Sequence, residues 1–399
     1  MTLRDQSLEL HAKLQGKISQ ENKAPVETYD DLKLLYSPGV AEPCLEIQKD
    51  PEKAYDYTWK GNTIAVISDG SAVLGLGNIG ALASLPVMEG KAMLIKEFGG
   101  INSIPLILDT QDTEQLIQTI RYLAPGFGGI HLEDISAPRC FEIEDRLADE
   151  LDIPVFHDDQ HGTAIIVLAW LINSLKLKGY LLPVTGSLSI DVAGNRKQET
   201  GNRIEDVKIV LSGSGAAGFR IAELLWAYGF RDITTFDSKG AICQCREWLT
   251  EQKKLIAGYN NDHCNTATLV ESLAWKDVFI GVSQPDLLKA EDVARMNDNP
   301  IIFALANPTP EIDYNEAKKG WAYIVATGRS DYPNQINNLS VFPGLWKGLL
   351  AKRIPKVLIE HKLKLATILA EYVWDKLSPE YIVPSVFDRN VADIIAKEM

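Results

Sequence analysis

Residues Val207 to Asp237, VKIVLSGSGAAGFRIAELLWAYGFRDITTFD, decide the fold of this chain. The stretch begins as an apolar run typical of a buried strand and passes through a glycine-rich turn into an apolar-periodic helix that ends near Tyr228. A second strand follows and ends at Asp237. The turn consists of Gly213, Ser214, Gly215, Ala216, Ala217 and Gly218. This order of strand, glycines, helix and strand predicts a Rossmann-type unit that binds a dinucleotide.

Each glycine of the turn has its own physical task. Gly213 permits the tight turn, Gly215 lets the backbone approach a pyrophosphate, and Gly218 lets the helix pack on the strand. Asp237 stands about 20 residues after the last glycine, where a carboxylate binds ribose hydroxyls. The same carboxylate repels the 2′-phosphate of NADP, but Lys239 follows and could neutralise it. The sequence therefore leaves both NAD and NADP open.

The composition is that of a globular protein with an excess of acid. The chain has 399 residues, 46% hydrophobic and 24% charged, and its 40 basic and 54 acidic side chains give a net charge of −14. This balance argues against nucleic acid or an anionic membrane as the main partner. The longest apolar run, 164–172, is too short to span a bilayer and predicts a buried helix. The charged N-terminus lacks a signal core. Five cysteines in neither a disulfide framework nor a zinc pattern are typical of a reducing cytoplasm.

Two pairs of adjacent carboxylates follow two short predicted strands. Glu133 and Asp134 end the run GIHLED, and Asp158 and Asp159 end the run IPVFHDD. Because the carboxyl ends of parallel strands meet at one edge of a sheet, we expect these side chains to converge. Oxygens of Glu133, Asp134 and Asp159 would suit Mg²⁺ or Mn²⁺. The alternative is that these acids cap the helices that follow.

A lysine and a tyrosine are candidates for proton transfer. Lys91 lies inside the apolar segment 81–100, where desolvation would lower the pKa of its amine toward that of a useful base. Tyr36 begins the turn YSPG, which fixes the backbone, although this stretch alone favours a core tyrosine beside a loop. The glycine run Gly75 to Gly80 lacks an acidic residue after a following strand, so we interpret it as close helix packing.

Taken together, the motifs resemble those of the malic enzyme family in its short bacterial form. They stand in that family's order and cover nearly the whole chain: YSPGVAEPC, SDGSAVLGLGNIG, PVMEGKAMLIKEFGGI, LEDI, FHDDQHGTA, GSGAAG, ANPTPEI and NQINNLSVFPG. The resemblance implies an α/β fold with an N-terminal catalytic and metal-binding domain over 1–160 and a Rossmann-type NAD(P)-binding domain over 161–345. C-terminal helices over 346–399 would pack back on the first domain. It also implies a homodimer.

The resemblance further implies the oxidative decarboxylation of L-malate to pyruvate and CO₂ with NAD(P)⁺ and a divalent cation. Carried over by position, Tyr36 would be the general acid, and Lys91 the general base with Asp158 beside it. The metal ligands would be Glu133, Asp134 and Asp159, and the amides that bind the substrate carboxylates would be Asn307 and Asn338. These groups are expected to face the nicotinamide across one cleft between two domains.

Two departures from the family pattern and two other activities stay open. Ser71 and Ala72 stand where longer family members have an arginine that contacts substrate, and segment 182–201 is longer than expected and suggests a hairpin. An oxaloacetate decarboxylase or malolactic enzyme would need the same lysine, tyrosine and metal. The intact dinucleotide turn favours the dehydrogenase. The filled catalytic positions disfavour a non-catalytic nucleotide-binding regulator.

Overall fold

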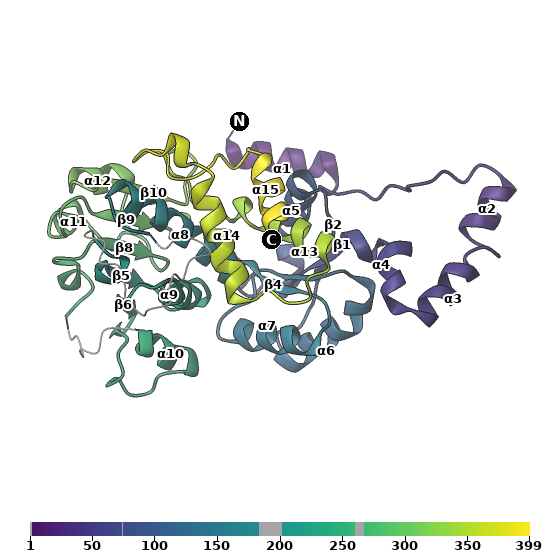
Figure 1. Cartoon of the computed structure of the whole chain (residues 1–399), viewed down its shortest axis with the longest axis horizontal. Coiled ribbons are helices and arrows are strands. Elements are labelled where there is room, and N and C mark those ends of the chain that lie inside the picture. The colour runs from purple at the N-terminus through teal and green to yellow at the C-terminus, as the bar shows by residue number, and fades with distance from the viewer. Residues whose placement is uncertain (1, 74, 183–201, 260–266) are drawn as a thin grey trace, which may run out of the picture.

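The structure is a computed structural model that describes residues 2–73, 75–182, 202–259 and 267–399. Two sheets with covering helices form the body of the molecule, and an arm of short helices projects from one end (Figure 1). The predicted α/β class is therefore confirmed. The hairpin expected within 182–201 lies outside the described residues, apart from residue 182.

The first sheet has four parallel strands in the order β2-β1-β3-β4. They are β1 (Thr63–Ser68), β2 (Asn102–Ile107), β3 (Ile130–Leu132) and β4 (Val155–His157). Parallel strands need long crossovers, which are supplied by helices α5 (Ala81–Gly99), α6 (Thr113–Leu123) and α7 (Arg139–Glu150). Strand β1 is buried along its whole length, in agreement with the apolar residues 64–67 at its centre. The carboxyl ends of all four strands thus lie at one edge.

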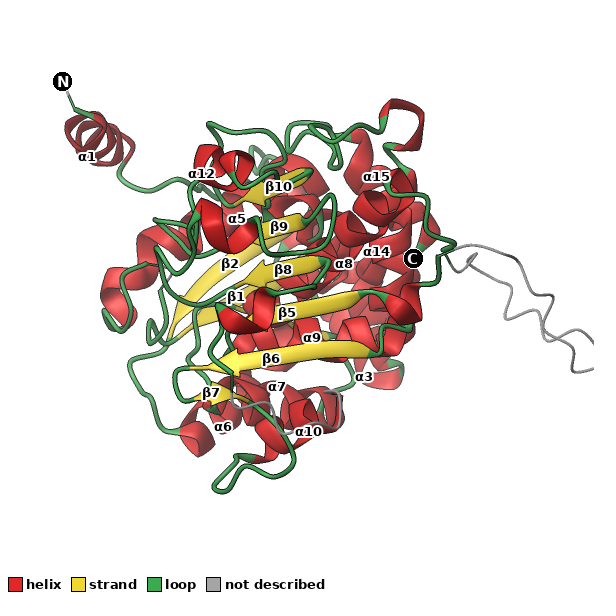
Figure 2. Ribbon diagram, turned by 90° about the vertical axis from the view of Figure 1, so that its left-hand side faces the viewer, coloured by secondary structure: helices red, strands yellow, loops and turns green. Residues whose placement is uncertain are grey.

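The second sheet has six strands in the order β10-β9-β8-β5-β6-β7 (Figure 2). They are β5 (Lys208–Ser212), β6 (Asp232–Asp237), β7 (Gly240–Ala241), β8 (Val278–Gly281), β9 (Ile301–Ala304) and β10 (Ile324–Thr327). Strand β7 runs antiparallel to β6, while the other neighbours are parallel. The chain runs outward from β5 through β6 and then from β8 in the other direction. Dinucleotides bind where the order reverses in this way, between β5 and β8.

One long helix joins the two sheets. Helix α8 (Asp158–Leu177) starts directly after β4 and contains the apolar run 164–172. It is buried over most of its length because it packs on α9 (Ala216–Tyr228) and on α14 (Ile359–Glu371). The predicted buried helix is confirmed. Its acidic first turn is held rigidly next to the first sheet.

The C-terminal helices return to the first sheet, as the sequence predicts. Helices α13 (Phe342–Lys352) and α15 (Asn390–Glu398) pack on each other and on α5. The approach of α13 to α5 needs a glycine, because a side-chain carbon at Gly99 would lie 2.7 Å from the Pro343 carbonyl oxygen. The predicted boundary at residue 346 falls inside α13, and the division into 1–160, 161–345 and 346–399 stays a prediction.

Residues 18–50, which we call the arm, do not pack on the body. The arm contains helices α2 (Tyr29–Leu35) and α3 (Ala41–Lys49), and none of its residues is buried. Thr28 caps α2 with a reciprocal bond to Asp31. Figure 1 shows α2 and α3 well away from both sheets.

Two further observations concern the length of the apolar helices and the state of the cysteines. Among the described residues, no helix combines the length and the apolar character that crossing a bilayer requires. Cys243, whose sulfur lies 3.0 Å from that of Cys245, is a free cysteine.

Candidate active site

Four carboxylates gather where β3 and β4 end. Glu133 and Asp134 directly follow β3, while Asp158 and Asp159 form the first turn of α8. One carboxylate oxygen from each of Glu133, Asp134 and Asp159 lies within 4.8 Å of the other two. The convergence expected at the ends of neighbouring parallel strands is thus present.

The donor set of this cluster fits a divalent cation. The backbone amide of Asp134 donates to Asp159 Oδ2 at 2.8 Å, and Asp134 adopts a left-handed φ of 54°. Burial, followed by the charge of Glu133, raises the pKa of Asp159. The four carboxylates and the Lys91 ammonium sum to a formal charge of −3. Buried carboxylate oxygens with a surplus of negative charge are the surroundings that Mg²⁺ or Mn²⁺ prefers.

Lys91 reaches the cluster from the middle of α5. Its Nζ lies 2.8 Å from Glu133 Oε1 and 2.8 Å from Asp158 Oδ2, and 4.4 Å from the centre of the Phe342 ring. Burial by itself lowers the pKa of the amine, but the charges of Asp158 and Glu133 outweigh burial and hold it above its ordinary value. The predicted lowering of this pKa is therefore wrong, because the sequence does not show two carboxylates at contact distance.

A histidine and a tryptophan support Glu133 from behind. His131 Nε2 lies 2.8 Å from Glu133 Oε2, and Trp346 Nε1 donates to His131 Nδ1 at 2.9 Å. Since Nδ1 accepts, Nε2 carries the proton and donates to the carboxylate. Burial lowers the pKa of His131 to about 3, so the ring is neutral. Alternation along β3 places His131 on the face of Glu133 and could have revealed it, whereas Trp346 comes from a distant helix.

Asn338 touches the site directly. Its amide nitrogen donates to Asp158 Oδ2 at 3.1 Å and to Thr163 Oγ1 at 3.3 Å, so it holds the carboxylate that contacts Lys91. The neighbouring Asn337 caps the short helix that follows, which is the ordinary explanation for an amide at such a place. The structure therefore places Asn338 at the site and Asn337 at a helix cap.

The loop between β1 and α5 faces the loop after β9, which carries Asn307. A side-chain carbon at Gly75 would lie 3.6 Å from the Asn307 carbonyl oxygen. Within the described residues the exposed Asn307 side chain makes no hydrogen bond to Lys91 or to the carboxylates. Gly77 and Gly80 have φ values of 73° and 79° and open space at the missing side chain, so the interpretation as close helix packing is wrong for them. These glycines serve the left-handed turns.

An arginine from α7 approaches the place where the sequence lacks one. Arg139 Nη2 donates to Ser71 Oγ at 3.0 Å and to Asp69 Oδ2 at 2.8 Å. Asp69 is buried, and the guanidinium of Arg139 balances the negative charge of its carboxylate. The positive charge missing at positions 71 and 72 is therefore present nearby, although it is already paired.

Tyr36 is a predicted site residue that lies apart from Lys91 and the carboxylate cluster in the structure. It follows α2 on the arm, and the residue is 67% exposed. Figure 1 places α2 far from α5, the helix of Lys91. The expectation of one cleft that contains both residues is contradicted within a single copy of the chain, because the arm leads Tyr36 away from its own body.

The glycine-rich turn has the geometry expected of a dinucleotide site. Gly213 has a φ of 117°, and its amide donates to the Phe236 carbonyl at 2.9 Å. A side-chain carbon at Gly218 would lie 2.1 Å from the Gly213 carbonyl oxygen, so helix α9 requires glycine there. Gly215 has no atom within 4 Å of the missing side chain, which leaves room for a pyrophosphate at the start of α9.

Asp237 ends β6 beside this turn and is held by two cations that the sequence analysis missed. Arg246 grips both of its oxygens at 2.9 Å and 2.8 Å, and Lys253 Nζ lies 2.6 Å from Oδ2. The backbone amide of Lys239 donates to Oδ1 at 2.8 Å. Burial would raise the pKa of Asp237, but these partners lower it to about 2. Arg246 lies in the irregular loop after β7, and Lys253 lies in the helix that follows this loop. No sequence motif marks either residue.

A dinucleotide-type sheet joined by one helix to a smaller sheet with a lysine and clustered carboxylates defines a two-domain enzyme of the dehydrogenase class. Two family models match the chain: the malic enzyme N-terminal domain over residues 15–148 and the malic enzyme NAD binding domain over residues 161–398. The chain belongs to the malic enzyme family.

Named relatives and solved structures agree with this membership. The bifunctional malic/malolactic enzyme of Bacillus subtilis is 46% identical over 100% of this chain and 92% of its own length. The NAD-dependent malic enzyme of Geobacillus stearothermophilus is 50% identical over 95% of this chain and 74% of its own. The crystal structure of the NAD-dependent malic enzyme of Thermotoga maritima matches with a TM-score of 0.89 and 43% identity, covering 98% of both chains.

Proposed function

We propose that the chain catalyses the oxidative decarboxylation of L-malate to pyruvate and CO₂ while NAD⁺ or NADP⁺ is reduced. The position of Lys91 carries the proposal, because its Nζ lies 2.8 Å from both Glu133 and Asp158 at the edge of the carboxylate cluster. An amine there can meet the hydroxyl of a 2-hydroxy acid bound at the cluster. The names of the Bacillus and Geobacillus relatives agree with this activity. The proposal includes a cytoplasmic location, which cell fractionation would check.

Mg²⁺ or Mn²⁺ is the metal of this proposal, with Glu133, Asp134 and Asp159 as ligands. A bound cation supplies a Lewis acid for the C2 oxygen and an electron sink for cleavage of the C3–C4 bond. The support is the set of three carboxylate oxygens within 4.8 Å of one another in a site of surplus negative charge.

Lys91 handles the proton of the C2 hydroxyl in this proposal. Asp158 positions the amine, and Asn338 in turn holds Asp158 through its amide at 3.1 Å. The raised pKa keeps Lys91 protonated as long as both carboxylates face it, so its use as a base requires that Glu133 turns toward the metal. Asn307 and Asn338 are the amide donors to the two carboxylates of malate in this proposal, and Asn338 would have to exchange its bond to Asp158 or Thr163 to serve as one.

The working enzyme in this proposal is a homodimer in which each copy lends Tyr36 to the other. Loss of CO₂ leaves an enol that must be protonated at C3, and a phenol is a suitable acid. Within one copy Tyr36 is 67% exposed on the arm and stands apart from Lys91. An arm that reaches a second copy would bring the phenol to the partner's Lys91.

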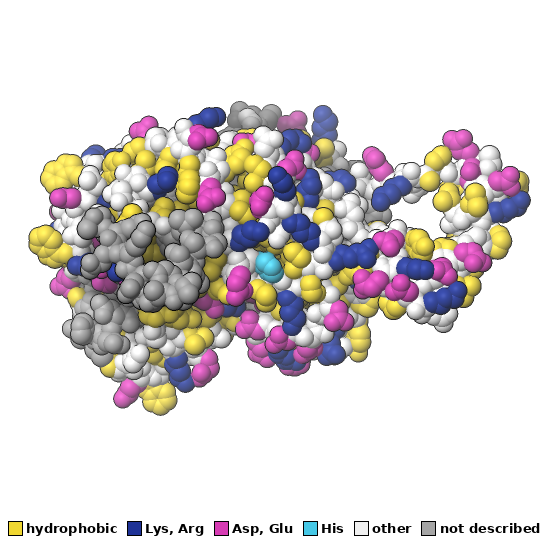
Figure 3. Space-filling view, viewed as in Figure 1, with side chains coloured by type: hydrophobic (Ala, Val, Ile, Leu, Met, Phe, Trp, Pro, Cys, Tyr) yellow, Lys and Arg dark blue, Asp and Glu magenta, His cyan; other side chains and the backbone are white. Residues whose placement is uncertain are grey.

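The side chains of the arm favour such a covering copy. Large apolar residues of α2 and α3 are 43% to 75% exposed, namely Leu32, Leu34, Leu35 and Leu45. Short helices gain their stability from burial of an apolar face, so these helices need another surface. Figure 3 shows hydrophobic side chains of the arm on the molecular surface among charged groups. A second copy buries this face and completes the site in one step.

An assay of the purified full-length protein tests the activity. L-Malate, Mn²⁺ and either cofactor should yield reduced nicotinamide and pyruvate in equal amounts, and chelation with EDTA should stop the reaction until Mn²⁺ is restored. Asp159→Asn should weaken Mn²⁺ binding in calorimetry by at least about 10-fold. Asp149→Asn, a change of an exposed carboxylate, is the matched control. No reduced nicotinamide with either cofactor would refute the proposal.

A malolactic activity is the second candidate, because the Bacillus relative bears the name bifunctional malic/malolactic enzyme. That reaction releases CO₂ from malate and leaves lactate, with no net reduction of the nucleotide. Separate measurement of lactate and pyruvate in the same assay distinguishes the two. Lactate equal to the malate consumed, without reduced nicotinamide, would favour the second candidate.

A further inference from the structure

The carboxylate of Asp237 stands at the expected ribose position, yet its acceptor capacity is used up. Oδ1 accepts from the Lys239 amide and from Arg246 Nη1, and Oδ2 accepts from Arg246 Nη2 and from Lys253 Nζ. A carboxylate offers about four lone-pair sites, two on each oxygen. The hydroxyls of an unmodified ribose would therefore have to displace a charged donor before they could bind this carboxylate.

The side chains around Asp237 have more hydrogen-bond donors than its carboxylate can accept. Within the described part of the chain, Arg246 Nε and the ammonium of Lys239 make no hydrogen bond, and Lys253 spends one of its three protons on Asp237. Arg246 and Lys253 against the one carboxylate of Asp237 give this group a formal charge of +1, before the neighbouring Lys239 is counted. A site with spare donors, no spare acceptor and positive charge selects a ligand that is anionic and rich in acceptors.

We infer that Arg246 and Lys253, positioned by Asp237, bind the 2′-phosphate of NADP⁺ and make the chain prefer NADP⁺ to NAD⁺. The inference rests on the proposed function and specifies its cofactor. A phosphate monoester carries about −1.5 to −2 charges and three acceptor oxygens, which matches the charge and the donors of this group. Asp237 then serves as the anchor that orients the guanidinium instead of as the ligand for ribose.

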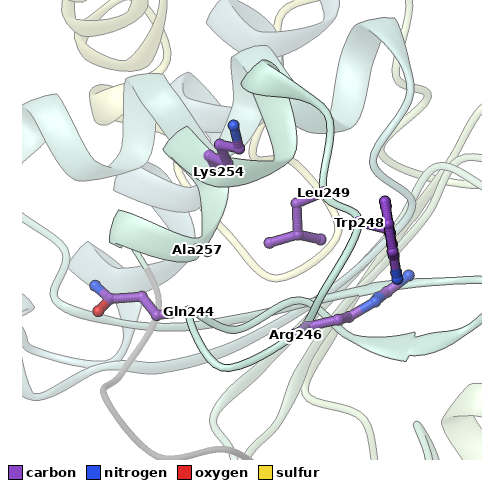
Figure 4. A pocket seen from close by; sticks show the side chains of 6 residues that line it. All are labelled: Gln244, Arg246, Trp248, Leu249, Lys254 and Ala257. Atoms are coloured by element: carbon purple, nitrogen blue, oxygen red, sulfur yellow. The ribbon is translucent and has the colours of Figure 1, made fainter.

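The surroundings leave space for such a group. A cavity of about 520 Å³ opens beside the loop after β7, and Arg246 lies in its wall. Figure 4 shows Arg246 and Trp248 on this loop and Lys254 on helix α10 (Glu251–Tyr259), which also carries Lys253. The Arg246 side chain is 18% exposed, so a ligand can reach it without unfolding the loop. The cavity thus gives the phosphate an approach to the guanidinium.

Calorimetry with two nucleotide probes tests the inference without malate. Adenosine 2′,5′-bisphosphate should bind the full-length protein at least about 10-fold more tightly than adenosine 5′-monophosphate. Arg246→Ala should weaken the bisphosphate by about 10- to 100-fold and leave the monophosphate unchanged or tighter, because Asp237 regains acceptor sites. Arg246→Lys should recover part of the loss. A merely structural role of Arg246 would weaken both probes equally.

Lys319→Ala is the matched control, because Lys319 pairs with Glu316 on helix α12 (Tyr314–Lys319) and is not among the residues that line the cavity. It should leave both affinities and the ratio of kcat/KM for the two cofactors unchanged, whereas Lys253→Ala should shift that ratio toward NAD⁺. Equal binding of the two probes, tighter binding of the monophosphate, or no binding of either would overturn the inference. Selective bisphosphate binding without malate oxidation would instead uphold the inference and refute the proposed function.

Discussion

The Lys91 site and the arm that carries Tyr36 are built in opposite ways. Lys91 is fixed by two carboxylates at 2.8 Å, and the supporting chain of Glu133, His131 and Trp346 is buried. Tyr36 follows a short helix on an arm without a single buried residue. One half of the proposed acid and base pair is therefore preorganised by the fold of a single copy. The other half depends on assembly.

Removal of Lys91 should have the largest effect. Lys91→Ala is expected to lower kcat by about 10³- to 10⁴-fold, because the base is lost and the carboxylates of Glu133 and Asp158 face each other unpaired. Lys96→Ala, an exposed change on the same helix, should keep near-normal turnover. Steady-state kinetics of the two variants side by side provides the check, and equal kcat values would remove Lys91 from the mechanism.

Removal of the phenol should have the next largest effect. Tyr36→Phe is expected to lower kcat by about 10²- to 10³-fold with little change in thermal stability, because Tyr36 is 67% exposed in its own copy. Tyr29→Phe on the same arm is the control, since that ring is 84% exposed. Should both variants turn over malate at the normal rate, the arm would have no catalytic task.

Loss of the support behind Glu133 should be milder. Trp346→Phe leaves His131 Nδ1 buried without its donor, which should cost about 1–3 kcal/mol of stability and reduce kcat by roughly 10-fold through the loosened carboxylate. Trp374→Phe is the control. It removes a similar hydrogen bond, from Trp374 Nε1 to Asn173 Oδ1 with a length of 2.9 Å, that lies outside the site. Urea unfolding together with kinetics should show a stability loss in both variants. A fall in kcat in the Trp374 variant as well would contradict the specific role of Trp346.

Acid should lower the free energy of unfolding through buried histidines such as His161. This is the smallest of the four effects that we expect. Burial lowers the pKa of His161 to about 3 from 6.5, so the unfolded chain binds the extra proton first. Stability is then fully present above pH 6.5 and is lost as the pH falls toward 3, by up to about 1.4 kcal/mol per unit. Urea midpoints between about pH 7.5 and 5.5 should fall less steeply in His161→Gln than in the normal chain. Identical slopes would refute this contribution.

The sequence predicted what neighbouring strands dictate. The doublets at 133–134 and 158–159 follow strands β3 and β4, so parallel pairing alone brings them together. The glycine turn and Asp237 lie within one βαβ unit, where spacing fixes geometry. The apolar run 164–172 likewise identified helix α8.

What the sequence did not predict depends on contacts between distant segments. The pKa of Lys91 rises instead of falling because Glu133 and Asp158 come from other elements. Arg246 and Lys253 reach Asp237 from the chain after β7, and no spacing rule marks them. The distance between Tyr36 and Lys91 depends on the direction of the arm. That direction is set by which surface, in the same copy or another, covers its apolar residues.

Mixing of two inactive variants tests most directly whether the active site is shared between copies. Lys91→Ala and Tyr36→Phe proteins, dissociated and reassociated together, should form heterodimers in which one of the two sites has both native residues. With random pairing, half of the dimers are mixed, so about one quarter of all sites and of the normal activity should return. Activity that stays at the average of the two parent variants would contradict the account and place both residues in one copy.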